Sequence, residues 1–206
     1  MKRKVDSRTT APEAALGLKA HSGWAALVVL GRRDDQLEVL ERSRLELVEE
    51  EWAKQPYHAA EELKPDEARK VVKRGIDAAK RIALREVGNV LQCIREYGFA
   101  VRSCGLLVGS PMPDWSVDEI LAVHFRMHQA EGVLFRDVLA QAAEACALKL
   151  VAVPEKSSLE HAEATLARNA GSLSQQIAML GKSVGAPWGK DQKDAALAAI
   201  IALGAD

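Results

Sequence analysis

The opening of the chain reads as three consecutive β-strands, and this feature most constrains the fold. Residues 14–30 hold two apolar runs separated by the turn pair Ser22-Gly23, which predicts a hairpin. After a polar turn at 32–35, apolar and charged residues alternate through 36–48, as in a strand with one solvated face. We therefore expect three antiparallel strands at the start of the domain.

The rest of the chain alternates helices with short buried strands. From Pro65 to a stop at Gly98, apolar residues recur every three or four positions, which predicts one long helix. The later segments are a strand over 101–108, a helix from the Ser116 capping box toward Leu148, a strand over 150–153, a helix after Ser157 interrupted near Gly171, and an alanine-rich helix over 191–203. This order implies an α/β fold: a mixed five-stranded sheet, three antiparallel strands followed by β-α-β crossovers, with helices on both faces.

Length and composition fit one folded domain. The 206 residues are 48% hydrophobic and 28% charged, which excludes disordered and collagen-like chains. Residues 1–13 are polar and are expected to form a flexible N-terminal arm, so that 14–206 make up the single domain. The three cysteines are scattered and have no metal-binding spacing, which indicates reduced thiols.

Net charge gives little support to a nucleic-acid partner. The formal charge is −1 and aromatic residues make up only 4% of the chain, so neither a global positive field nor a base-stacking surface is expected. A local basic patch is still compatible with these values. No apolar run is long enough to span a bilayer, and the basic start lacks a signal-type apolar segment. We therefore expect no membrane association and a cytoplasmic location.

Three short strings, together with the element order, resemble a known superfamily. The strings are Leu16-Gly-Leu-Lys-Ala-His-Ser22, Gln129-Ala-Glu-Gly-Val133 and Asp191-Gln-Lys-Asp194-Ala-Ala-Leu-Ala. They are similar to signatures of the RuvC Holliday-junction resolvases, a branch of the ribonuclease H-like superfamily. The resemblance implies a ribonuclease H-like fold and, because resolvases of this family are dimers, a homodimer by analogy.

The resemblance also implies a site, and this sequence departs from it. The family cleaves phosphodiesters with four carboxylates that hold two Mg²⁺ ions. Carried over by position, the carboxylate of the first strand is Lys19 here, and the one that ends the fourth strand falls at Gly109, where neither neighbour is acidic. Only Asp191 and Asp194 remain, so the catalytic carboxylate set is degenerate. We expect no metal ion or other cofactor at this site, with Mg²⁺ and Mn²⁺ disfavoured.

Lys19, Asp191 and Asp194 each have two readings. The aspartates lie three residues apart at a helix start, where a cap and a dipole-stabilising acid are common. Alternatively they form a site with Lys19, which would then be partly buried and would pair with them or contact an anion. A lysine that extends out of an exposed strand face is an equally good reading of Lys19 alone.

His124, His128 and Glu131 share one face of the second long helix, together with Phe135. Two histidines four residues apart can share a metal, and Glu131 could be the third ligand. A polar helix side with Glu131 paired to a neighbouring cation is the favoured reading, and a polar site cluster without metal is compatible with it.

The remaining candidates come from turns, a loop and this helix. The candidate catalytic residues are Lys19, Glu131, Asp191 and Asp194, and the candidate binding residues are His21, Ser22, His58, His124, His128 and Arg136. Neighbouring side chains on a turn, such as His21 and Ser22, rarely make the hydrogen bond that nucleophile activation needs.

Two functions are compatible with these residues, besides a homo-oligomeric scaffold in which the alanine-rich last helix allows close helix approach within the chain or between chains. The first is a ribonuclease H-like protein that has lost two-metal cleavage and acts as a binding or assembly module. The alternative is a hydrolase or phosphoryl-transfer enzyme with a rebuilt site that uses Lys19, His124, His128, Glu131 and Asp194.

Overall fold

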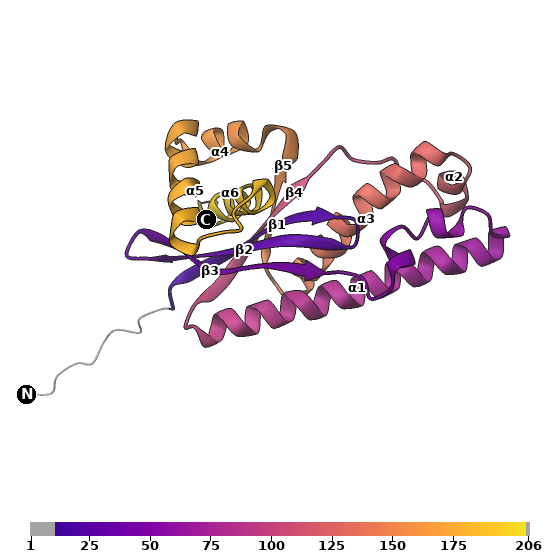
Figure 1. Cartoon of the computed structure of the whole chain (residues 1–206), viewed down its shortest axis with the longest axis horizontal. Coiled ribbons are helices and arrows are strands. Elements are labelled where there is room, and N and C mark those ends of the chain that lie inside the picture. The colour runs from indigo at the N-terminus through magenta and orange to yellow at the C-terminus, as the bar shows by residue number, and fades with distance from the viewer. Residues whose placement is uncertain (1–10, 205–206) are drawn as a thin grey trace, which may run out of the picture.

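The computed structural model describes residues 11–204, and its strands form one mixed sheet (Figure 1). The five strands are ordered β3-β2-β1-β4-β5. β1 pairs antiparallel with β2, which pairs antiparallel with β3, whereas β1–β4 and β4–β5 are parallel. This arrangement confirms the predicted α/β fold class. The strands are β1 (Glu13–His21), β2 (Trp24–Arg33), β3 (Gln36–Glu46), β4 (Ala100–Val108) and β5 (Lys149–Pro154).

Helices cover both faces of the sheet. α1 and α3 pack on one face, and α4, α5 and α6 pack on the other (Figure 1). Adjacent strand residues such as Leu106 and Leu107 belong to these two different cores, because successive strand side chains point to opposite faces. The helices are α1 (Pro65–Glu96), α2 (Val117–Leu121), α3 (His124–Ala145), α4 (Ser158–Leu166), α5 (Ala170–Val184) and α6 (Lys190–Gly204), with short 3₁₀ turns η1 (Glu51–Lys54), η2 (His58–Ala60) and η3 (Glu155–Ser157).

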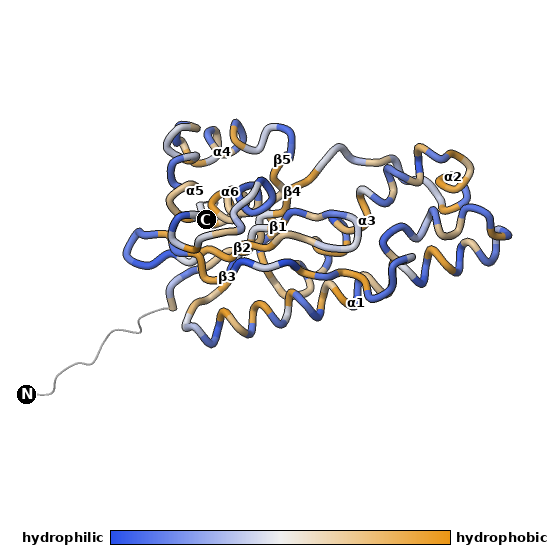
Figure 2. Tube along the Cα trace, viewed as in Figure 1, coloured by the Kyte–Doolittle hydropathy of each residue, from blue (hydrophilic) through white to orange (hydrophobic). Residues whose placement is uncertain are grey.

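α1 follows the predicted periodicity closely. Pro65 is its first residue, and Gly98, in the left-handed region at φ 83°, follows its end. Figure 2 shows hydrophilic and hydrophobic residues alternating along this helix, as expected for one buried face. The predicted helix continued to a stop at Gly98, but the helix ends at Glu96 and Tyr97 is exposed.

One predicted helix is interrupted where no break was expected, and the break in a second lies at a slightly different place. The helix expected from Ser116 to Leu148 is divided into α2 and α3, because Val123 adopts an extended conformation. The break allows Ile120 of α2 to pack into a third apolar cluster with α1 and η2, beyond the sheet. The later break falls at 167–169 rather than at Gly171, since the side chain of Asn169 caps the N-terminus of α5.

α6 lies directly on the centre of the sheet. A Cβ atom at Gly17 would come within 1.8 Å of the Ala195 carbonyl oxygen, and one at Gly105 within 2.1 Å of the Ala198 carbonyl oxygen. The alanines of α6 are fully buried against these strands and α4. The alanine-rich sequence therefore serves close packing within the chain.

The N-terminal arm predicted over 1–13 lies mostly outside the described residues. β1 begins at Glu13, one residue earlier than predicted, and the backbone N–H of Ala100 donates to the carbonyl of Pro12. Cys104 is a buried free thiol, and Cys93 and Cys146 are half-buried free thiols. Among the helices of residues 11–204, none combines the length and apolar character that a bilayer span requires.

Candidate functional site

Lys19 is buried at the end of β1 and is surrounded by carboxylates. The residue is only 5% exposed. Its Nζ donates to Asp194 Oδ2 at 2.7 Å and lies 3.1 Å from Asp191 Oδ1 and 3.6 Å from Glu155 Oε1. The predicted pairing of Lys19 with both aspartates is therefore present, and the reading of an exposed lysine is wrong.

Three elements position these acids. α6 starts at Lys190 over the end of β1, which places Asp191 and Asp194 on its first turns beside Lys19. Glu155 follows β5 directly, and β5 runs parallel to β4 and hence to β1. The carboxyl ends of parallel strands meet at one edge of a sheet, which is where open α/β folds place ligands.

Hydrogen bonds stabilise the ionised forms of Lys19 and Asp194. Burial by itself would lower the pKa of Lys19, but hydrogen bonds to Asp194 and Asp191 outweigh it and raise that pKa. Burial raises the pKa of Asp194, and hydrogen bonds from Lys19 and Lys190 reverse this effect and lower it. Lys19 is therefore a permanent cation at neutral pH.

Three further groups extend the network. His21 Nε2 lies 3.2 Å from Asp191 Oδ2, and its ring stacks on Trp24 with 4.2 Å between centroids. Arg136 Nη2 lies 3.5 Å from Glu155 Oε2, and Lys190 Nζ donates to Asp194 at 2.6 Å.

The position expected for the fourth-strand carboxylate is covered by a cation. A Cβ atom at Gly109 would come within 2.5 Å of Arg136 Nη1, so the guanidinium fills the space that a side chain would take. Three carboxylates (Glu155, Asp191, Asp194) thus face three permanent cations (Lys19, Arg136, Lys190).

Glu155 is a site residue that the sequence analysis missed. It lies outside the motif positions of the resemblance, which put the fourth-strand carboxylate at Gly109. The available signal was the position of Glu155 immediately after the last short strand, since the ends of parallel strands converge.

The other candidates gather in a second group. His124 and His128 on α3 meet His58 of η2, and Glu131 pairs with His58 rather than with its own helix neighbours. Glu131 and Phe135 are 3% and 1% exposed, so the C-terminal part of the helix face that was expected to be polar is buried in the core. The residues of this group are His58, Glu61, His124, His128 and Glu131, and none of them belongs to the Lys19 network.

Ser22 lies near the second group without joining it. It lines a cavity of about 350 Å³ together with His58 and Trp52. His21, its neighbour, belongs to the Lys19 network, so the two turn residues point to different surroundings.

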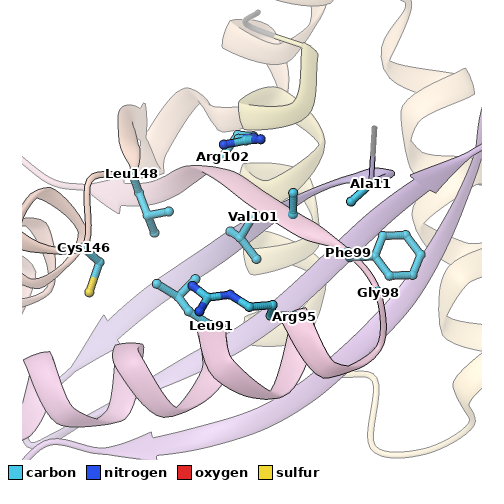
Figure 3. A pocket seen from close by; sticks show the side chains of 10 residues that line it. Ala11, Leu91, Arg95, Gly98, Phe99, Val101, Arg102, Cys146 and Leu148 are labelled. Carbon is cyan, nitrogen blue, oxygen red and sulfur yellow. The ribbon is translucent and has the colours of Figure 1, made fainter. Parts of the chain in front are cut away.

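A further cavity of about 370 Å³ lies at the start of β4, at the end of the sheet away from Lys19; Figure 3 shows its lining residues. Leu91, Arg95 and Leu148 are among its lining residues, together with residues 100–102 at the start of β4. Ligands of open α/β sheets bind at the carboxyl ends of the strands, so this cavity is a weaker candidate than the Lys19 edge.

Comparison with solved structures finds distant similarities. This chain is similar to the Thermus thermophilus RuvC structure, at 14% identity and a TM-score of 0.45, covering 91% of this chain and 92% of the other. It is also similar to T. thermophilus RuvC in complex with a Holliday junction substrate, at 11% identity and a TM-score of 0.48, covering 91% of each chain. No protein-family model matches the sequence, and no curated protein matches it. The order and connections of the strands are those of a mixed five-stranded α/β sheet, in which β1, β4 and β5 run parallel.

Proposed function

We propose that this ribonuclease H-like protein does not cleave phosphodiesters by two-metal catalysis and acts as a binding or assembly module. The observation that carries the proposal is the position of Lys19 Nζ, within 3.6 Å of three carboxylates. An ammonium group at this position satisfies the charges that metal ions would otherwise neutralise.

Electrostatics explains why Lys19 and a divalent ion are incompatible here. At 4 Å, two unit charges near a protein surface interact with about 4 kcal/mol, so a divalent ion beside Lys19 meets a repulsion on the order of 8 kcal/mol. Losing the proton does not relieve this repulsion at neutral pH, because Asp194 and Asp191 raise the pKa of Lys19.

The proposal is tested by exchanging the charge of Lys19. We expect the unmodified chain to show no Mg²⁺- or Mn²⁺-dependent cleavage of four-way junctions, duplexes or RNA–DNA hybrids. The variant Lys19→Asp should gain at least tenfold in Mn²⁺ affinity by calorimetry, since it adds a carboxylate to Glu155, Asp191 and Asp194. Lys19→Met is the matched control, because it removes the ammonium group without adding a ligand.

Metal-dependent cleavage by the unmodified chain that is lost in Asp194→Asn would contradict the proposal. Equal Mn²⁺ affinity of the unmodified chain, Lys19→Asp and Lys19→Met would show that Lys19 does not control cation access.

The partner of such a module is identified by binding measurements. We include a homodimer in the proposal through the family resemblance, and a cytoplasmic location through the free thiols. Titration with junction and duplex DNA at two salt concentrations separates partner classes, because phosphate contacts weaken steeply with salt. Equilibrium sedimentation measures self-association directly.

The alternative enzyme would need both groups of candidates to act at one centre. Lys19 and Asp194 lie in one group, whereas His124, His128 and Glu131 lie in the other. An activity that required members of both groups would favour the enzyme over the binding module.

A further inference from the structure

The histidines of the second group converge from two separate parts of the chain. His124 and His128 lie one turn apart on the first turns of α3, and His58 begins η2. Their ring centroids are 4.6 to 5.1 Å apart, and one nitrogen of each ring lies within 4.8 Å of the others. We propose that His58, His124 and His128 form a binding site for a divalent transition metal of the Zn²⁺ class.

The spacing of the ring nitrogens suits a shared metal. His124 Nε2 and His128 Nε2 lie 3.2 Å apart. Two imidazoles that bind one tetrahedral Zn²⁺ at about 2.0–2.1 Å have nitrogens roughly 3.3 Å apart. Only small movements of exposed side chains would therefore bring the pair to ligand geometry.

A buried carboxylate, Glu131, orients the ring of His58 for metal binding. Glu131 Oε2 lies 2.7 Å from His58 Nδ1, and Glu131 Oε1 accepts the backbone N–H of His58 at 3.1 Å. An ionised carboxylate only accepts hydrogen bonds, so Nδ1 carries the proton of this bond and Nε2 is the ring atom left to bind a metal. This is the orientation that carboxylates impose on metal-bound histidines.

His58 Nε2 is a buried nitrogen without a protein partner. Among the described residues, no group hydrogen-bonds to it, although solvent does not reach it. Buried polar atoms are rarely left unpaired, because the loss of hydration is not compensated. A metal ion at the centre of the three rings would supply the missing interaction.

His124 has a similar carboxylate partner. Its Nδ1 lies 3.3 Å from Glu61 Oε1, which again favours a proton on Nδ1 and leaves Nε2, the atom that faces His128 Nε2, as the ligand atom. Two of the three rings thus have the same donor arrangement, each with a carboxylate behind it. Three histidine ligands leave the fourth tetrahedral position to water or an added ligand.

The ligand set also predicts selectivity. Imidazole nitrogens favour Zn²⁺, Ni²⁺ and Cu²⁺, whereas Mg²⁺ requires oxygen ligands. The site is independent of the proposed function, because the histidine group and the Lys19 network share no residue.

The helix pattern suggested a different third ligand. Glu131 is the acid one turn after His128, but the structure places it behind His58, where it orients a ligand. His58 lies 73 residues from Glu131 in the chain, so no local spacing indicates its part in the cluster.

The test is a titration of the full chain with Zn²⁺ in competition with a chromophoric chelator, in the presence of excess Mg²⁺. We expect one ion per chain, and Co²⁺ in its place should give the visible absorption of a four-coordinate site. The double variant His124→Ala, His128→Ala should weaken binding at least 100-fold. Both residues are exposed, so the variant should fold.

Two further variants distinguish ligands from their surroundings. Glu131→Gln should weaken Zn²⁺ binding by about 10- to 100-fold, as loss of a supporting carboxylate does. His161→Ala, a histidine of α4 outside the cluster, should leave the affinity unchanged. Absence of one-to-one binding, or equal affinity in the double variant, would overturn the proposal.

Discussion

At the scale of single residues, two glycines allow the last helix to reach the sheet. Gly17 on β1 and Gly105 on β4 face the backbone of α6, where any Cβ atom would overlap a carbonyl group. Backbone atoms cannot rotate away as a flexible side chain can, so the contact tolerates no added volume. Lys19 lies two residues after Gly17, and the position of Asp194 beside it depends on this close approach.

Gly17→Ala is therefore expected to lower the free energy of unfolding by about 3 kcal/mol or more, the upper range for overpacking. Gly88→Ala on α1 is the control, since no atom lies within 4 Å of the added Cβ there. That variant should be stabilised by roughly 0.5–1 kcal/mol through helix propensity. Chemical denaturation measures both, and equal stability of the two variants would contradict the packing of α6 described above.

At the scale of elements, α6 is held at both ends by side chains from the sheet. Arg42 donates to the carbonyls of Gly185 and Pro187, in the loop that leads into α6, both at 2.7 Å. At the other end, Arg32 donates to the Leu203 carbonyl at 2.8 Å, and Ser103 donates to the Ala202 carbonyl at 3.0 Å. Carbonyls at a helix C-terminus have no partner within the helix, so these bonds complete it.

Removal of the Arg42 contacts should loosen the start of α6 first. We expect Arg42→Gln to increase amide hydrogen exchange over residues 185–194 several-fold, with little change in α1, because the entry loop loses its side-chain partner. Arg85→Gln, which removes exposed ion pairs of α1, is the control and should leave that segment unchanged. Unchanged exchange in Arg42→Gln would mean that packing alone holds the loop.

At the scale of the whole molecule, the Lys19–Asp194 pair joins the first strand to the last helix. The two residues are separated by 175 positions in the chain. The pair is mostly shielded from solvent, with side chains 7% and 20% exposed, so it should contribute more than a surface ion pair.

The pair also makes stability depend on pH. Asp194 has a lower pKa in the folded chain than in the unfolded one, so its contribution is present above the unfolded pKa of about 3.9 and is lost as the pH falls through the folded value. Asp194→Asn should lower the free energy of unfolding by about 2 kcal/mol at pH 7, the range for hydrogen bonds to charged groups.

The free energy of unfolding of Asp194→Asn should approach that of the unmodified chain as the pH falls below about 4, as measured by urea denaturation at a series of pH values. Asp77→Asn is the control: its hydrogen bond to Lys73 also lowers the Asp77 pKa, but the pair is exposed, so the effect should be much smaller. A constant difference down to pH 2.5 would show that the ion pair does not stabilise the fold.

Local patterns predicted most of the elements. The long helix after Pro65 follows from a period of 3.6 and the third strand from a period of 2, which are set by the directions of neighbouring side chains. The first two strands follow from apolar runs on either side of Ser22-Gly23. The prediction of one helix from Ser116 to Leu148 was wrong at Val123, where the chain is extended. On the N-terminal side of this break, Ile120 packs into a separate apolar cluster. Such a contact has no local signal.

By itself, the sequence determined the order of the strands and helices along the chain, and it placed Lys19 on the first strand and two aspartates at the start of the last helix. It left open whether Lys19 is exposed or buried beside them, which the structure decided. Only the tertiary structure decided that Glu155 and Arg136 complete the Lys19 network, and that His58 joins His124 and His128 in front of Glu131. The physical reason is that periodicity records which way each side chain points within its own element. Which distant side chains then meet depends on how closely the elements pack. Here the Lys19 network depends on the close packing of α6 on Gly17, and the histidine group depends on the packing of η2 against α3.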